Sequence, residues 1–341
     1  MEMTLRSIAD LVAGAGIRAA RETGNEPEPA LTQPADWPIQ CTVGPGLEGA
    51  IACESRVGYV NGSKGWLVYR GYDIFELCAR ADYDEVCWLL LHGVLPNRRE
   101  LAGFRQKIAA YRHVPGTLRL LMGFPVEKMA PMAALRLGTN LMRQEFTFCD
   151  IDPDDGENRR NAEEAGTDWV SLDDDSIAME TPPLGGARAV YEFSPVASSP
   201  RMPGSDLQSA DGLEACYHLI AGIPTMAAAI SRIRRGLMPI DPDPQLSLSA
   251  NFLYMLTGRR PTELETRIMD ICFILHADHG MNASTFACLV VASTLSDLYF
   301  SIGAGIGALN GPLHGGANEQ VLYMLEDARQ SVNVSQFVHD K

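Results

Sequence analysis

Residues 73–96 read DIFELCARADYDEVCWLLLHGVLP, and this stretch decides the class of fold. Its apolar residues recur at intervals of three and four, which is the spacing of residues on one face of an α-helix. Gly93 and Pro96 close the stretch, and both residue types stop helices. The stretch therefore predicts a helix that ends near Gly93.

Helical periodicity continues through most of the remaining chain. It predicts helices over residues 97–114, 131–144, 212–236, 247–258, 261–280, 284–309 and 317–328. Strand-like alternation is confined to residues 50–72, where Asn61-Gly62 separates two short apolar runs and indicates a β-hairpin. We therefore predict an all-α, mainly helical fold with a small N-terminal β-hairpin.

The composition is typical of a soluble globular protein with an excess of acidic residues. Of 341 residues, 46% are hydrophobic and 21% are charged, and the formal net charge is −15. This charge argues against nucleic acid or an anionic membrane as a partner. The longest apolar stretch, 286–309, is interrupted by polar residues such as Asp297, so it predicts a tightly packed buried helix instead of a membrane span.

The cysteines and the N-terminal residues bear on the cellular compartment. None of the eight cysteines forms a CxxC pair and most lie in apolar runs, which predicts buried free thiols in a reducing compartment. Residues 1–24 are typical of an amphipathic helix and lack the continuous apolar segment of a secretion signal. We therefore expect a cytoplasmic protein.

Residues 150–211 interrupt the helical pattern with a run rich in Asp, Glu, Pro, Ser and Gly. The lack of periodicity predicts a solvated loop. Asp150, Asp152 and Asp154 are spaced loosely as in a calcium-binding loop, but the glycine and the last ligand of that pattern fall at the wrong positions. We therefore predict no metal site.

Two clusters carry residues suited to chemistry, and the first is HADHGMNAST, residues 276–285. His276 and His279 are three residues apart, so they share one face if the helix continues through them. We expect the helix to end at His279-Gly280, which allows His279 to turn into a cavity. The alternative is structural, with one histidine in the core and the other capping a carbonyl. The spacing does not match the zinc-binding HExxH pattern.

The second cluster is GPLHGGANEQVLYML, residues 311–325. Pro312 ends the preceding helix, and Gly315 and Gly316 let a ligand or another backbone segment approach closely. The helix that follows has its positive end near His314, which disfavours the charged imidazolium. A neutral His314 can donate an N–H to an oxygen that gains charge, such as that of an enolate. The alternative is a helix-entry turn in which the histidine has no role.

These clusters resemble the citrate synthase family, and so do GWLVYRGYDI, LLLHGVLP, ALRLGTN and NFLYMLTGRRP in the same chain order. The resemblance covers roughly residues 46–150 and 212–330. It implies a mostly helical homodimer that condenses acetyl-CoA with oxaloacetate to give citrate and CoA. It also implies that no metal or other cofactor is needed, since acetyl-CoA is a substrate.

The resemblance implies roles for particular residues. His314 matches the histidine that hydrogen-bonds the thioester carbonyl while the acetyl methyl group loses a proton. His279 matches a histidine that contacts oxaloacetate. The turn beside the CoA thioester is matched by Gly315, Gly316, Ala317 and Asn318.

The resemblance also implies a division of the chain. An N-terminal arm spans 1–42, a large helical domain spans 43–313 with an acidic insertion at about 152–211, and a small domain begins at 314–341. The family's GHRVY-like motif, substrate arginines and aspartate base have no counterparts in this sequence. We therefore expect a C-terminally truncated member that lacks about a hundred residues of its small domain and is inactive alone.

Two other functions remain open at this point. A 2-methylcitrate synthase uses propionyl-CoA, and one extra methylene in the acyl pocket changes binding by only ~1–3 kcal/mol. A non-catalytic relative would bind CoA or a partner subunit. For the dimer, we expect residues 284–309 to form the interface, because small residues there permit close approach: Gly303, Ala304, Gly305 and Gly307.

Overall fold

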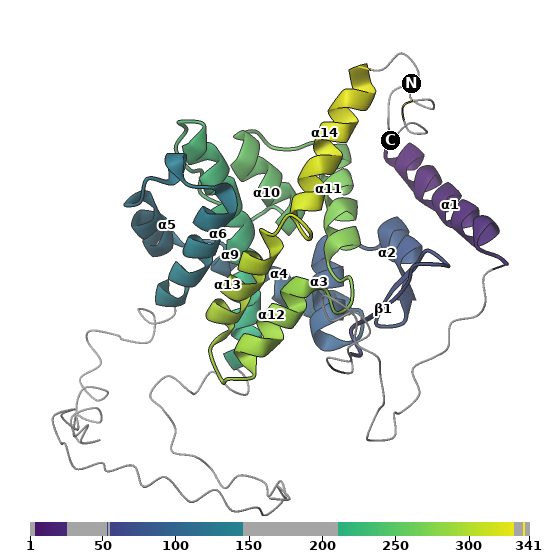
Figure 1. The fold of residues 1–341 in the computed structure, drawn as a ribbon, viewed down its shortest axis with the longest axis horizontal. Coiled ribbons are helices and arrows are strands. Elements are labelled where there is room, and N and C mark those ends of the chain that lie inside the picture. The colour runs from purple at the N-terminus through teal and green to yellow at the C-terminus, as the bar shows by residue number, and fades with distance from the viewer. Residues whose placement is uncertain (1–3, 26–52, 54, 146–210, 331–336, 338–341) are drawn as a thin grey trace, which may run out of the picture.

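The computed structural model describes residues 4–25, 53, 55–145, 211–330 and 337 (Figure 1). The acidic stretch predicted as a loop lies almost entirely outside these residues, as does the loosely calcium-like spacing within it. Of the predicted N-terminal arm, residues 1–3 and 26–42 also lie outside them. The described part is mostly helical, which confirms the predicted fold class.

Helices form the body of the molecule. They are α1 (Leu5–Glu22), α2 (Ile74–Arg80), α3 (Tyr83–His92), α4 (Arg98–Tyr111), α5 (Pro115–Met122), the 3₁₀ turn η2 (Val126–Lys128), α6 (Pro131–Leu141), α9 (Asp211–Arg234), α10 (Leu248–Thr257), α11 (Glu263–His276), α12 (Ala283–Ala292), α13 (Leu298–Leu309) and α14 (Gly316–Gln330). The N-terminal amphipathic helix is confirmed as α1. Helix α5 was not predicted.

The predicted hairpin is present and belongs to a three-stranded antiparallel sheet. Strands β1 (Gly58–Asn61), β2 (Trp66–Tyr69) and β3 (Tyr72–Asp73) follow one another in that order across the sheet. The residue with positive φ in the first turn is Gly65, at 61°, and not Gly62 of the predicted Asn-Gly pair. The sheet and α1 lie at one side of the helical body, and α5 and α6 lie at the opposite side (Figure 1).

The single helix predicted over 73–96 is wrong, because the structure contains two. The backbone leaves the helical conformation at Ala81, and Asp82 caps the start of α3. The Asp82 side chain accepts the Glu85 N–H while the Glu85 carboxylate accepts the Asp82 N–H, which satisfies two unpaired amides of the new helix. The D-x-x-E spacing was present in the sequence and is a recognised helix-start signal.

The single buried helix predicted over 284–309 is also wrong. Residues 293–297 turn the chain, Leu295 has φ of 65°, and the Asp297 side chain caps α13 by accepting the Phe300 N–H. Helices α12 and α13 then pack against each other (Figure 1). None of the α12 residues is fully buried, so this apolar helix lies at the surface of the described chain.

The hydrophobic core of the described residues consists of three clusters, two of which include α9. One cluster joins α5, α6, α9 and α13, a second joins the sheet with α2, α3 and α11, and a third joins α3, α4, α9 and α10. Residues Gly212–Arg234 of α9 are long and apolar enough to cross a membrane by length and composition, and 61% of the tested window is buried inside the protein. Such burial is what a core helix of a globular protein shows.

Candidate active site

The loop at 277–282 carries His279 between α11 and α12. Helix α11 ends at His276, earlier than predicted, so His276 and His279 do not share a helix face and that expectation is wrong. The His276 Nδ1 lies 2.7 Å from the Cys272 carbonyl oxygen, which is the capping role of the structural alternative. The His279 side chain is exposed and makes no hydrogen bond to a residue in the described ranges. It is therefore available to a ligand.

The turn at 310–315 carries His314 between α13 and α14. Its backbone is closed by three N–H groups: those of His314 and Gly316 donate to the Gly311 carbonyl, and that of Gly315 donates to the Leu309 carbonyl, all within 3.0–3.1 Å. A Cβ at Gly315 would lie 2.2 Å from the Leu309 carbonyl oxygen. The structure thus brings another backbone segment against Gly315, one of the two alternatives that the sequence left open.

The His314 imidazole is partly buried and is hydrogen-bonded to the Ser284 side chain. The His314 Nε2 lies 2.8 Å from the Ser284 Oγ, which also lies 2.9 Å from the Gly305 carbonyl oxygen. The hydroxyl has one proton to donate. If it donates to Gly305, the His314 Nε2 must carry the ring proton; if it donates to Nε2, the proton of a neutral ring is on Nδ1. The rotation of one hydroxyl therefore selects the tautomer of His314.

Sequence reasoning did not single out Ser284, although it lies inside the quoted cluster 276–285. Asn282 caps α12 by accepting the Thr285 N–H at 3.0 Å, so Ser284 occupies the first turn. Ser284 is five residues after His279 and is hydrogen-bonded to His314. The beginning of α12 therefore connects the two histidines that the sequence predicted as site residues. The capping residue was readable from the sequence, but the partner across 30 residues was not.

The four residues predicted to bind CoA are consecutive with His314. Gly315 belongs to the turn, and Gly316 is the first residue of α14. Ala317 and Asn318 occupy the first turn of the same helix. The backbone N–H groups at the start of a helix lack intrahelical acceptors and carry partial positive charge, which suits a polar or anionic group of a ligand.

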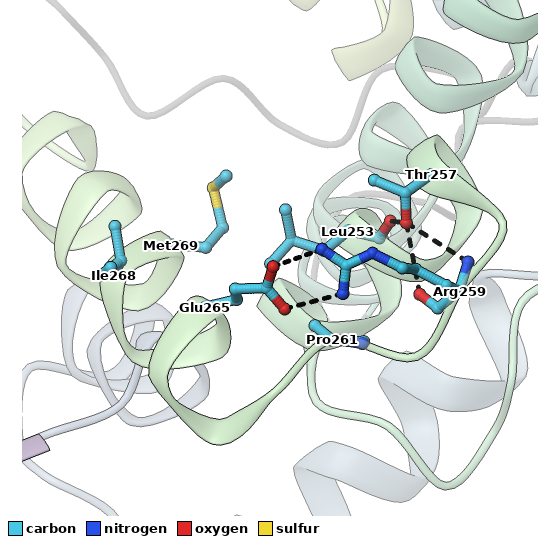
Figure 2. A pocket seen from close by; sticks show the side chains of 7 residues that line it. All are labelled: Leu253, Thr257, Arg259, Pro261, Glu265, Ile268 and Met269. Atoms are coloured by element: carbon cyan, nitrogen blue, oxygen red, sulfur yellow. Dashed lines mark hydrogen bonds and ion pairs between the residues drawn. The ribbon is translucent and has the colours of Figure 1, made fainter. Parts of the chain in front are cut away.

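A separate hollow of about 200 Å³ lies between α10 and α11 (Figure 2). Its lining is apolar apart from Thr257 and an exposed ion pair between Arg259 and Glu265, in which Nη1 and Nη2 of the guanidinium donate to the carboxylate. Hydrogen bonds from Arg259 lower the pKa of Glu265 to about 2. The pair lies at the start of α11. Neither His279 nor His314 lines this hollow.

The remaining groups with possible chemistry are metal-ligating side chains and thiols. In the described ranges, no three His, Cys, Asp or Glu side chains gather so that they could hold a metal ion. The six cysteines in those ranges are free, and two of them, Cys53 and Cys272, are exposed and so depart from the expected burial.

A sequence model of the family, described as "Citrate synthase, C-terminal domain", matches residues 46–172 and 187–341. The chain belongs to the citrate synthase family. Residues 1–45 are not matched, and the internal unmatched range, 173–186, falls inside the acidic stretch. This membership confirms the resemblance inferred from the two histidine clusters.

Individual relatives agree with the family assignment. The chain is 36% identical over 287 residues to a citrate synthase of Haloferax volcanii, covering 84% of this chain and 62% of the relative. It is 34% identical to a citrate/2-methylcitrate synthase of Bacillus subtilis, covering 87% and 65%. A solved citrate synthase of Pyrobaculum aerophilum superposes with a TM-score of 0.61 at 33% identity, covering 88% and 64%. The chain thus spans somewhat less than two thirds of the length of these relatives.

Proposed function

We propose that the protein carrying this chain is a citrate synthase that condenses acetyl-CoA with oxaloacetate to give citrate and CoA. The observation that supports this best is the pair formed by Ser284 and His314, 2.8 Å apart, at the beginning of α12. This pair orients an imidazole beside the loop of His279. The relatives named as citrate synthases supply the reaction and its substrates.

The proposed role of His314 depends on when charge develops. The thioester carbonyl oxygen gains negative charge only as the methyl proton leaves, so a donor directed at that oxygen acts mainly in the transition state. His314 can donate from Nδ1 while it stays neutral only if the Ser284 hydroxyl donates to Nε2 and not to the Gly305 carbonyl. The Ser284 hydroxyl donates to the Gly305 carbonyl in the structure, and its rotation onto Nε2 is what prepares His314 for this step.

The proposed role of His279 is to bind oxaloacetate. Its imidazole is exposed and without a described hydrogen-bond partner, and the nearby start of α12 offers free backbone N–H groups of its first turn. Oxaloacetate carries two carboxylates and a ketone, all of which accept hydrogen bonds before the reaction begins. Positive helix ends and imidazole N–H groups suit such a ligand.

Propionyl-CoA is the second candidate substrate, and a specific observation favours keeping it. One relative is named as a citrate/2-methylcitrate synthase at 34% identity, close to the 36% of the citrate synthase from Haloferax volcanii. The two acyl groups differ by one methylene, which a hydrophobic pocket separates by only ~1–3 kcal/mol.

A homodimer is the proposed assembly. Phe286, Leu289 and Val290 are exposed on α12 at the spacing of one helix face, and Phe300 of α13 is 55% exposed. Gly303 and Gly305 serve contacts inside the chain, because a Cβ would lie 2.2 Å from Asn140 Oδ1 or 2.5 Å from Cys288 Sγ. The surface proposed for the partner is therefore the apolar face of α12 together with the exposed part of α13, where Gly307 of the predicted run of small residues is exposed.

The proposal also includes a division into two domains and a reducing cellular compartment. The apolar residues Val321, Leu322 and Leu325 of α14 are exposed, and α14 projects away from the helical body (Figure 1). These features support a second, smaller domain that begins at 314, after a large domain over 43–313. The free thiols of the described cysteines support a reducing compartment such as the cytoplasm.

The proposal is tested on the product of the complete gene. Thiol release is measured with oxaloacetate and either acetyl-CoA or propionyl-CoA, and sedimentation measures the mass of the assembly. We expect release of CoA with acetyl-CoA at a higher kcat/KM than with propionyl-CoA, from a dimer. A higher kcat/KM with propionyl-CoA assigns 2-methylcitrate synthase, and no release with either substrate contradicts an enzyme of this type.

A further inference from the structure

The sheet meets the His279 loop through a buried tyrosine, Tyr69, the last residue of β2. Its side chain is fully buried, and the ring packs in the cluster that includes Ile74, Leu77 and Ile274. The position of its hydroxyl is therefore set by the core and not by the loop that it contacts.

The Tyr69 hydroxyl binds the backbone on both sides of the α11 end. The oxygen lies 2.8 Å from the Ile274 carbonyl and 2.9 Å from the Asp278 carbonyl, and it accepts the Asp278 N–H at 3.2 Å. Burial raises the pKa of Tyr69 to about 12, so the hydroxyl keeps its proton at neutral pH. One side chain thus fixes the backbone of the residue that immediately precedes His279.

A second contact lies directly across the sheet. Gly58 of β1 pairs with Tyr69, and a Cβ at Gly58 would lie 2.2 Å from the Asp278 Oδ2. That carboxylate also accepts the Gly280 N–H at 3.2 Å, and Gly280 has φ of 67°. Because Gly58 has no side chain, the Asp278 carboxylate fits against β1. It thus closes the His279 loop by a contact separate from that of Tyr69.

The end of β2 is anchored independently of the loop. Arg70, which follows Tyr69, has φ of 50°, a conformation that is uncommon outside glycine. Its Nη2 donates to the Leu90 carbonyl of α3 at 2.7 Å. Tyr69, at the end of β2, and Arg70, in the turn that follows, thus hold the His279 loop and α3, which makes the small sheet a fixed support between them.

We infer that Tyr69 is a positioning residue for His279, and that Gly58 is required because it admits the Asp278 carboxylate. The inference rests on the proposed function for the ligand of His279. The claim that Tyr69 and the Asp278 carboxylate hold the loop does not depend on that function. The loop has three bonded links to the sheet or within itself at residues 278 and 280. Losing them would leave His279 on a longer free segment, so ordering it on ligand binding would cost affinity.

The first test is Tyr69→Phe, which keeps the ring and removes only the hydroxyl. Tyr72→Phe is the matched control, because Tyr72 lies on the same sheet and its side chain makes no hydrogen bond within the described ranges. Amide hydrogen exchange of residues 277–282 and the steady-state constants for oxaloacetate are measured on the complete protein. We expect faster exchange in Tyr69→Phe and a KM for oxaloacetate raised about tenfold, with a smaller change in kcat.

The second test is Gly58→Ala, which leaves the Tyr69 side chain unchanged and acts mainly on the Asp278 carboxylate, since the Cβ would lie 2.2 Å from its Oδ2 and 3.1 Å from the Val68 carbonyl oxygen. If Tyr69→Phe fails to fold, Gly58→Ala still tests the inference, because it leaves Tyr69 and the core around its ring in place. The expected signature is the same, with faster exchange at residues 278–280 and a raised KM for oxaloacetate. A variant may instead be less stable overall while its loop amides exchange no faster relative to the rest of the protein. Such a result is not this signature.

Each outcome decides the inference. Faster loop exchange with a KM effect larger than the kcat effect, absent from Tyr72→Phe, supports it. Unchanged exchange in the substituted proteins overturns it, and so does faster exchange with unchanged oxaloacetate affinity. If the wild-type protein neither binds nor uses oxaloacetate, the proposed function fails, and the exchange result alone then judges whether Tyr69 holds the loop.

Discussion

The two turns that carry the candidate histidines are built in different ways. The His314 turn is closed mainly by its own neighbours, since Gly311, Leu309 and the glycines after His314 supply its backbone hydrogen bonds. The His279 loop is held by Tyr69, a residue 209 positions away in the sequence. The first is a local turn with one long-range contact, to Ser284, and the second is a loop fixed by a distant sheet.

The difference shows which residues position each histidine. A turn closed by local backbone bonds places its side chain as soon as the chain segment forms, and glycine is then the residue on which it depends. A loop fixed by a distant hydroxyl places its side chain only after the core has assembled. Substitutions should therefore affect the two sites through different residues and to different extents.

The largest expected effect separates the two histidines by the kinetic constant that changes. His314→Gln in the complete protein should lower turnover by about 10²–10³-fold, because the donor acts on an oxygen that gains charge only in the transition state. His279→Gln should mainly weaken oxaloacetate binding, because its acceptor is present before reaction. Steady-state kinetics and oxaloacetate titration on both variants measure the contrast.

His276→Gln is the control for these substitutions. It removes a third histidine from the same region, whose ring lies against the Cys272 carbonyl of its own helix. We expect turnover and oxaloacetate affinity close to wild type. Near-wild-type turnover in His314→Gln, or a loss confined to oxaloacetate affinity, would contradict the role assigned to His314.

A smaller effect is expected from the glycine that closes the His314 turn. Gly315→Ala places a Cβ 2.2 Å from the Leu309 carbonyl oxygen, and the backbone cannot move aside without breaking the turn. We expect a loss of about 1–3 kcal/mol of stability, seen as a lower Tm in thermal unfolding. Gly103→Ala in α4 is the control, since open space surrounds that position and alanine favours helix. Equal Tm values for the two variants would show that the turn is not limited by Gly315.

The smallest expected effect concerns the tautomer of His314. Ser284→Ala removes the contact with the Gly305 carbonyl and the hydrogen bond to the His314 Nε2; the latter is worth ~0.5–1.5 kcal/mol, so turnover should fall about tenfold or less. Ser293→Ala is the matched control at the other end of α12, where the hydroxyl donates only to the Val290 carbonyl. A turnover loss as large as that of His314→Gln would mean that Ser284 takes part directly and does not only orient the ring.

Much of the fold was predictable because its signals are local. Helical spacing identified most helices, and the Pro and Gly residues around His314 identified a turn ahead of α14. The failures at residues 81–82 and 293–297 were different in kind. The first contained a readable capping box that starts at Asp82, whereas the second continues an apolar run in which only Asp297 marks the new helix.

The sequence by itself determined the helical class and the family, and it supplied the two histidines as candidate site residues. These follow from periodicity and from motifs of neighbouring residues, which a chain segment carries wherever it lies. Only the tertiary structure decided that Ser284 faces His314 and that Tyr69 holds the residue before His279. Those contacts join residues 30 and 209 positions apart, and they form because the core brings separate helices and strands together. No local pattern encodes which distant hydroxyl will face a given backbone group, since that depends on how every intervening element packs.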